Sequence, residues 1–269
     1  MPGPQRSGHK IHMPITTEQV KELRDQTGIS VMQCKNALEE AGGDMQKALA
    51  ILKKISSDIA LKKGSREVKD GRVGLKSAGQ KAVLVTLHCE TDFVAKNEDF
   101  SRLLQELTDQ ALQEGAEKMK NGAKEKIDAL IQKTGENIQL GDVYEVEGGV
   151  LGTYLHNNKI GVIVSLSGGN ADLAKDVAMH IAAMKPEFIS QDDISEENRK
   201  TMEEIFAKEV AGVEKPAEIK QKMLLGKMAT YFKERTLLDQ AFIKNAEETV
   251  GSLLKKAGAA IKEVKRSSV

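Results

Sequence analysis

Three adjacent residues, His88, Cys89 and Glu90, have the side-chain types that a thiol hydrolase uses as base, nucleophile and orienting acid. The stretch that contains them, KAVLVTLHCE, places apolar side chains at every second position, which predicts a β-strand. Because consecutive residues of a strand point to opposite faces, His88 and Cys89 cannot form a hydrogen-bonded pair. A half-buried strand is therefore the preferred interpretation, and a thiol enzyme or esterase built around Cys89 is a remote alternative.

Motifs for nucleotide and metal chemistry are absent from the sequence. It contains no G-x-x-x-x-G-K-[ST] loop and no G-x-G-x-x-G after a predicted strand. It also contains no H-E-x-x-H and no Cys/His spacing suited to zinc. His180 falls in the apolar stripe of a predicted helix, where the pattern favours a packed histidine over a general base. We therefore expect a binding protein, not an enzyme, with no cofactor and no metal site of its own.

The composition argues against several other classes. The 269 residues include 40 Lys plus Arg and 40 Asp plus Glu, and such a balance does not suit a protein that coats nucleic acid. The two cysteines lie far apart and outside any C-x-x-C, which suits the reducing cytosol and predicts a cytoplasmic protein. No apolar stretch approaches the roughly 20 residues that a membrane span needs. We therefore expect neither direct nucleic-acid binding nor membrane insertion.

The stretch CETDFVAKNEDF, residues 89–100, joins the predicted strand to a predicted helix. Asn97 can cap that helix, and the acidic residues after Asn97 suit the positive end of the helix dipole. Asp92 and Phe93 therefore lie at a strand-to-helix corner. An acid beside a phenyl ring is unusual there, because the chain has only six Phe. From the residues alone, we interpret Phe93 as a ring that pins the corner to its own core.

Residues 14–55 carry the pattern of three short helices. Thr16 and Ser30 each stand three residues before a Gln, which is the capping-box spacing. Gly28 and Gly42 follow apolar stripes at positions where helices often end in a left-handed residue. Three helices in about forty residues make a minimal bundle, a size at which good packing is required for stability.

Both segments that flank this bundle lack a helical period. Residues 1–13 contain two prolines and no apolar core of a signal peptide, so we interpret them as a leader or tag that ends at the natural start, Met13. A short native extension is the alternative. Residues 56–70 are polar, which predicts a linker whose first residues can be helical.

The remaining chain reads as two α+β subdomains, because strands followed by a helix occur twice. We place the first subdomain at residues 71–142 and the second at 143–194 together with 237–245. Residues 195–236 read as two helices around a Gly-Pro break, and Ser195 can cap the first of them. This pattern predicts an inserted helical hairpin whose apolar positions pack its two helices together. Residues 246–269 are predicted to form a short C-terminal helix. The predicted fold class is α+β, with antiparallel sheets.

Four stretches, in the same order, resemble the bacterial elongation factor Ts family. VKELRDQTGISVMQCKNALEEAGGDMQKAL (20–49) is similar to its amino-terminal signature, and TDFVAKNEDF (91–100) is similar to its second signature. KIGVIV and MHIAAMKPEFI are similar to further stretches of the family. The resemblance runs from about residue 15 to about residue 254. It implies an N-terminal module like a ubiquitin-associated domain, a core of two α+β subdomains, a helical hairpin and a C-terminal module.

The resemblance also implies a function, which is guanine-nucleotide exchange on elongation factor Tu without covalent chemistry. The expected partner is elongation factor Tu in its GDP-bound and nucleotide-free states. In the family, the corner that corresponds to Thr91, Asp92, Phe93 and Val94 enters the GTPase domain, disturbs its magnesium site and releases GDP. The resemblance implies further partner contacts at Val31, Met32, Lys35, Ile160, Gly161, His180, Phe242 and Ile243. The next residue, Lys244, departs from the apolar residue of a known relative.

A protein-interaction adaptor that docks through the three-helix module is the alternative function. Exchange needs the Asp92–Phe93 corner, whereas docking needs only the first module. Without the resemblance, Lys35 reads as a solvated lysine, and Val31 and Met32 read as core residues of their helix.

Overall fold

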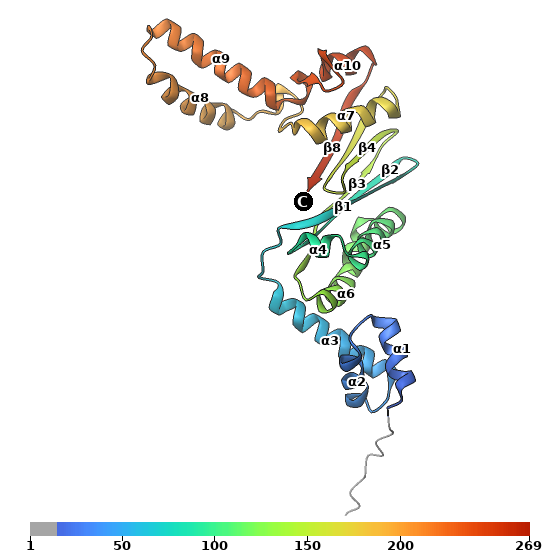
Figure 1. Ribbon diagram of the computed structural model, residues 1–269. Helices are drawn as coiled ribbons and strands as arrows, with labels where there is room; N and C mark the ends of the chain where they lie inside the picture. The colour runs from blue at the N-terminus through green and yellow to red at the C-terminus, as the bar shows by residue number, and fades with distance from the viewer. Residues whose placement is uncertain (1–14) are drawn as a thin grey trace, which may run out of the picture. The chain divides into compact units, whose positions relative to one another are not determined.

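The computed structural model describes residues 15–269, whose helices and strands are drawn in Figure 1. These residues form two compact units, each discontinuous in sequence. The predicted leader, residues 1–13, lies outside the described residues. The first unit comprises the chain from residue 15 to Gly71, Leu87–Leu107 and Glu117–Gly141, and the second comprises Arg72–Thr86, Thr108–Ala116 and Asp142–Val269.

The first unit begins with a bundle of three helices, as the sequence predicts. They are α1 (Thr17–Thr27), α2 (Val31–Glu40) and α3 (Met45–Lys63). Thr16 and Ser30 cap the first two helices, and each side chain accepts a hydrogen bond from the backbone N–H three residues later. Gly28 ends α1 in the left-handed conformation, with φ of 67°. The bundle has its own core, formed by Leu23, Ile29, Cys34, Ala37, Leu38, Ala48 and Leu52.

The predicted strand, corner and helix follow in the expected order. The elements are β1 (Asp70–Ala78), β2 (Lys81–Cys89), α4 (Asp92–Ala95), α5 (Glu98–Glu114), α6 (Ala116–Thr134) and β3 (Ile138–Glu147). Asn97 precedes α5, where its side chain accepts a hydrogen bond of 2.8 Å from the Asp99 N–H. The three strands form one sheet in the order β1-β2-β3. The predicted boundary between residues 142 and 143 falls inside β3, one residue from the point between Gly141 and Asp142 at which the two compact units divide.

Helix α3 is longer than predicted and occupies much of the predicted linker, residues 56–70. The sequence allows a helical start of this linker but does not show its length, because the inward positions of the added turns are small or polar, not large and apolar. Ser56 is 4% exposed and Ala60 is 9% exposed. The Ser56 hydroxyl donates to the Leu52 carbonyl at 2.9 Å and also contacts the Gln132 side chain on α6. This part of α3 is thus held by hydrogen bonds and not by an apolar stripe.

The second unit contains an antiparallel sheet in the order β4-β5-β8, and helix α7 packs on it. Its elements are β4 (Val150–His156), β5 (Ile160–Ser167), α7 (Ala171–Met184) and β8 (Ala260–Ser268). Val162, Val164 and Leu166 of β5 meet Val177 and Ile181 of α7 in the core. The α+β fold class is thereby confirmed.

The C-terminal tail differs from its prediction as a helix. Only α10 (Val250–Lys256) is helical, and β8 then pairs with β5 along the sheet. Ile261 and Val264 of β8 pack against the core cluster, although basic residues stand beside them. The tail therefore belongs to the second sheet, which supplies the apolar surface that the short, charged segment lacks.

The hairpin predicted at residues 195–236 is present as α8 (Glu196–Ala211) and α9 (Ala217–Arg235), which pack side by side (orange in Figure 1). Ser195 caps α8, as predicted. The chain then forms a two-stranded ribbon of β6 (Ala241–Phe242) and β7 (Asn245–Thr249). Between residues 15 and 269, no helix is both long enough and apolar enough to cross a membrane.

Candidate protein-interaction site

The corner after β2 presents the Phe93 ring to solvent. Phe93 is 82% exposed, whereas Phe100, seven residues later on α5, is 0% exposed. An exposed phenyl ring forgoes roughly 1.5–3 kcal/mol of burial free energy. The interpretation that Phe93 pins the corner to its own core is therefore wrong, and the ring is available to a partner.

The helix that carries Phe93 is only one turn long, but the chain holds it at several points. The Thr91 hydroxyl caps α4 by accepting a hydrogen bond of 3.4 Å from the Val94 N–H. The Thr91 carbonyl accepts one from the Ala95 N–H at 3.1 Å and one from the Cys89 thiol, also at 3.1 Å. Ala95 is 2% exposed and faces inward. These contacts fix the backbone under a ring that projects outward.

Asp92 occupies the first turn of α4, beside the exposed ring. Its Oδ2 lies 2.7 Å from Lys96 Nζ, and the two side chains are 48% and 69% exposed. An exposed ion pair at this spacing contributes only about 0.3–0.5 kcal/mol. The carboxylate can therefore leave Lys96 for another cation at little cost.

The thiol of Cys89 makes a structural contact within the corner. Cys89 is 0% exposed and donates to a backbone carbonyl, as described above. The prediction that this stretch is a strand is confirmed by β2. Throughout residues 15–269, no group of three or more metal-ligating side chains lies close enough to hold an ion.

The first module has an exposed face on α2. Val31 is 53% exposed and Met32 is 65% exposed, while the Lys35 side chain is 54% exposed and pairs with Glu39 at 3.7 Å. The interpretation of Val31 and Met32 as core residues is therefore wrong. The residues of α2 that the bundle buries are Cys34, Ala37 and Leu38. A hollow of about 570 Å³ beside this face is lined by Ile15, Val20, Arg24, Val31 and Lys35.

Three of the partner contacts implied for the second unit are buried. Gly161 lies under other side chains, and an added Cβ would stand 2.7 Å from Val73 Cγ1. His180 is 0% exposed and Phe242 is 5% exposed. Surrounding side chains of the second unit enclose all three in this conformation, so a direct contact between these residues and a partner stays a prediction. Ile160 is half-buried against that core, and Ile243 is 46% exposed.

His180 holds the turn that exposes Ile243. His180 Nδ1 accepts a hydrogen bond of 3.2 Å from the Ile243 N–H, so the ring proton belongs on Nε2, which donates to Gln240 Oε1 at 2.9 Å. Gln240 Nε2 donates to the Glu234 carbonyl at 2.6 Å. The Phe242 ring lies beside His180, with centroids 6.0 Å apart. The pattern-based interpretation of His180 as a packed histidine is confirmed.

The same turn has a second anchor on α7. Lys244 Nζ lies 2.5 Å from Asp176 Oδ1, and both side chains are partly exposed. The lysine that departs from an apolar residue of a known relative thus makes an ion pair in this chain. This exposed ion pair adds a weak contact between α7 and the turn next to Ile243.

Protonation of His180 should destabilise the second unit. Burial lowers the pKa of His180, and the hydrogen bond with Gln240 only partly opposes that effect. The unfolded chain therefore binds a proton near pH 6.5 that the folded chain resists. Stability from this group is complete above about pH 6.5 and falls as the pH drops towards the folded-state pKa.

Denaturant unfolding at pH 7.5 and 5.5 measures this dependence. His180→Gln should lose about 1–3 kcal/mol at pH 7.5, because buried partners are left without their bonds, and its stability should change less with pH. An unchanged pH dependence in His180→Gln would contradict this account.

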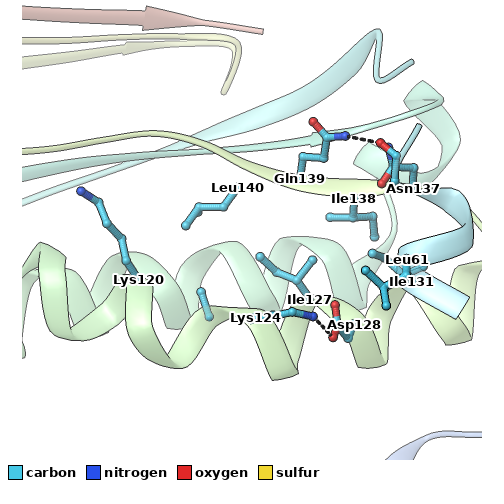
Figure 2. A pocket seen from close by; sticks show the side chains of 13 residues that line it. Leu61, Lys120, Lys124, Ile127, Asp128, Ile131, Asn137, Ile138, Gln139 and Leu140 are labelled. Carbon is cyan, nitrogen blue, oxygen red and sulfur yellow. Dashed lines mark hydrogen bonds and ion pairs between the residues drawn. The ribbon is translucent and has the colours of Figure 1, made fainter. Parts of the chain in front are cut away.

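An open groove runs along α6 in the first unit (Figure 2). Its volume is about 360 Å³. Polar groups at its rim are bonded within the chain, since Lys124 Nζ pairs with Asp128 at 2.5 Å and Gln139 Nε2 donates to the Gly64 carbonyl at 3.3 Å. The groove therefore offers an apolar surface and no reactive constellation. Its apolar lining comes from Ala60, Leu61, Ala123, Ile127, Ile131, Ile138 and Leu140.

The sequence reasoning missed apolar side chains that the hairpin presents outward. Ile205 is 44% exposed, Ile219 is 45% exposed and Leu225 is 63% exposed. We treated the apolar positions of both helices as their mutual contact. The sequence does contain a signal for these exposed side chains. Both helices have more apolar positions than a single buried stripe on each helix can hold.

The sequence of this chain is similar to those of one protein family. The family model described as Elongation factor TS matches residues 90–269. Elongation factor Ts of Hahella chejuensis is 43% identical over 262 residues, which cover 95% of this chain and 92% of the relative. The protein of the same name from Thioalkalivibrio sulfidiphilus is 40% identical over 271 residues, with 96% and 92% covered. That of Pseudomonas aeruginosa PAO1 is 40% identical over 256 residues, with 92% and 88% covered.

Proposed function

The chain belongs to the elongation factor Ts family and is a translation elongation factor, and from this premise we propose that it binds elongation factor Tu and promotes the release of GDP. The observation that carries the proposal is the Phe93 ring, which is 82% exposed on a helix turn fixed by Thr91. We propose cytoplasmic action on the GDP-bound and nucleotide-free partner, without covalent chemistry. Direct binding to nucleic acid or to a membrane has no part in the proposal.

The corner would act as a wedge. Burial of the Phe93 ring contributes roughly 1.5–3 kcal/mol, but only where the partner opens an apolar gap for it. Binding of the ring therefore biases the partner towards that open state. The Asp92 carboxylate, released from Lys96, would arrive beside the groups that hold magnesium and weaken their grip on the ion. Thr91 and Val94 would set the position of both side chains.

Separate surfaces would supply most of the affinity. On the first unit, we propose that Val31, Met32 and Lys35 form one contact, because two of them are exposed and apolar and the third is a cation. On the second unit, we propose Ile243 with the half-buried Ile160. The buried residues Gly161, His180 and Phe242 support that second surface from within.

Reciprocal coupling gives a test of this function. If the protein weakens the binding of GDP to elongation factor Tu, GDP must weaken the binding of the protein by the same factor. We expect a lower affinity for elongation factor Tu at saturating GDP than without nucleotide, as measured by calorimetry or surface plasmon resonance. A coupling of about 1–3 kcal/mol corresponds to a factor of about 5–150.

An affinity that GDP does not change would contradict the proposed exchange function. It would favour the adaptor, which docks through the three-helix module and has no reason to respond to the nucleotide. Phe93→Ala and Met32→Ala separate the two further, since an adaptor depends on Met32 and not on Phe93.

A further inference from the structure

The turn between α6 and β3 contacts the Phe93 corner and is itself held by several hydrogen bonds. Gly135 ends α6 with φ of 78°, and its carbonyl accepts a bond from Lys63 at the end of α3. The next residue, Glu136, donates its backbone N–H to the Thr134 hydroxyl at 3.3 Å. That hydroxyl donates to the Leu130 carbonyl at 2.9 Å. These hydrogen bonds hold the backbone of Glu136 in place.

The Glu136 carboxylate binds both donors of a single residue, Thr91. Its Oε1 accepts a hydrogen bond of 2.7 Å from the Thr91 hydroxyl, and its Oε2 accepts one of 3.1 Å from the Thr91 N–H. Hydrogen bonds to a charged group are about twice as strong as neutral ones. Because the hydroxyl proton points to Glu136, an oxygen lone pair is left to accept the Val94 N–H and cap α4.

The neighbouring residue, Asn137, ties the turn to the other side of the same corner. The Asn137 N–H donates to Glu90 Oε1 at 2.6 Å, and its side-chain amide donates to the Arg66 carbonyl at 2.7 Å. Asn137 is 1% exposed. Glu90 and Thr91, the two residues that lead into α4, are therefore both held by this turn.

We infer that Glu136 is a positioning residue that sets the orientation of the Phe93 corner through Thr91. The inference rests on the proposed function of that corner. Glu136 itself need not touch the partner, because its carboxylate is engaged by Thr91. Its contribution is to keep α4 in the one orientation that directs Phe93 and Asp92 outward before the partner arrives.

Glu136→Gln tests this role, because an amide can accept from one Thr91 donor but turns its NH₂ towards the other. With wild-type elongation factor Tu, the plateau rate of GDP release at saturating protein should fall about tenfold, as expected for the loss of one charge-assisted hydrogen bond. The half-saturating concentration should change less than twofold, because surfaces other than the Phe93 corner provide most of the binding affinity. Glu106→Gln, which removes a carboxylate paired with Lys126 at 2.6 Å in the same unit, is the control and should leave both values unchanged.

A double-mutant cycle decides whether Glu136 acts through the corner. In a Phe93→Ala background, Glu136→Gln should cause a smaller loss of plateau rate than it does alone, because only the contribution of Asp92 remains to be lost. An independent, full further loss would overturn the inference, as would a wild-type plateau in the single variant Glu136→Gln.

Amide hydrogen exchange of the free protein separates this inference from the proposed function. Glu136→Gln should speed exchange at Val94 and Ala95 about tenfold, and Glu106→Gln should not. Unchanged protection at both amides would overturn the inference even if wild-type exchange activity is strong. If the wild-type protein fails to release GDP, the proposed function fails, and the amide measurement still decides whether Glu136 holds the corner.

Discussion

Replacement of Phe93 by alanine should remove most of the acceleration of GDP release and leave the free protein as stable as wild type. The ring is 82% exposed in the free chain, so its truncation opens no cavity there. Its burial against the partner is worth roughly 1.5–3 kcal/mol, which corresponds to a loss of about 10- to 150-fold in rate. A nucleotide-exchange assay and a denaturant melt of the same preparation measure the two effects.

Phe100→Ala provides the matched control for this substitution. Phe100 is fully buried on α5, in the same unit, so the same truncation should cost about 3–5 kcal/mol of folding stability. The two alanine variants should therefore show opposite behaviour, one impaired in exchange and the other in stability. A Phe93→Ala protein that is strongly destabilised, yet exchanges GDP normally while folded, would return Phe93 to a structural role.

Gly152→Ala should unfold or severely destabilise the second unit. Gly152 lies on β4 opposite Val164 of β5, and an added Cβ would collide with backbone atoms of Ala174 and Lys175 in α7. Backbone cannot move aside as a flexible side chain can, so α7 would have to lift from the sheet. Overpacking of a core typically costs about 1–3 kcal/mol, and we expect a loss above that range here.

Gly149→Ala is the control, because a Cβ at this exposed glycine would meet no atom within 4 Å. Denaturant melts followed by circular dichroism should place Gly149→Ala within about 0.5 kcal/mol of wild type, as for ordinary surface substitutions. If Gly152→Ala is equally stable, the close approach of α7 to β4 is not a constraint on the fold.

Local signals in the sequence predicted where many elements begin. Thr16, Ser30, Asn97 and Ser195 were identified as caps from their side chains and spacing, and each accepts the expected backbone hydrogen bond. Such bonds form within a few residues of the cap, so the surrounding fold does not decide them. The alternation around Cys89 predicted β2 for the same reason.

Contacts between distant segments could not be predicted in this way. Ser56 looked like part of a linker because its partner, Gln132, is on another helix. The tail looked helical because its pairing with β5 depends on residues about a hundred positions earlier. Whether an apolar residue at a predicted corner is buried also depends on distant elements, which is why Phe93 was interpreted as a core residue without the family resemblance.

The contacts that shape the candidate site were likewise hidden from the sequence. Thr91 and Glu136 are separated by 45 positions, and nothing in either local pattern links them. The family resemblance has a limit of its own, because His180 and Phe242, which it implies as partner contacts, are buried. Residues implied by resemblance to contact a partner can instead support an exposed neighbour, as His180 supports the turn that exposes Ile243.

The most direct test is the rate at which fluorescent GDP leaves elongation factor Tu in a stopped-flow instrument, measured against increasing concentrations of this protein and of Phe93→Ala. We predict that the wild-type rate rises to a plateau far above spontaneous release. The variant should half-saturate at a similar concentration and reach a plateau about 10- to 150-fold lower. A wild-type protein that forms the complex but leaves GDP release at its spontaneous rate would contradict the account.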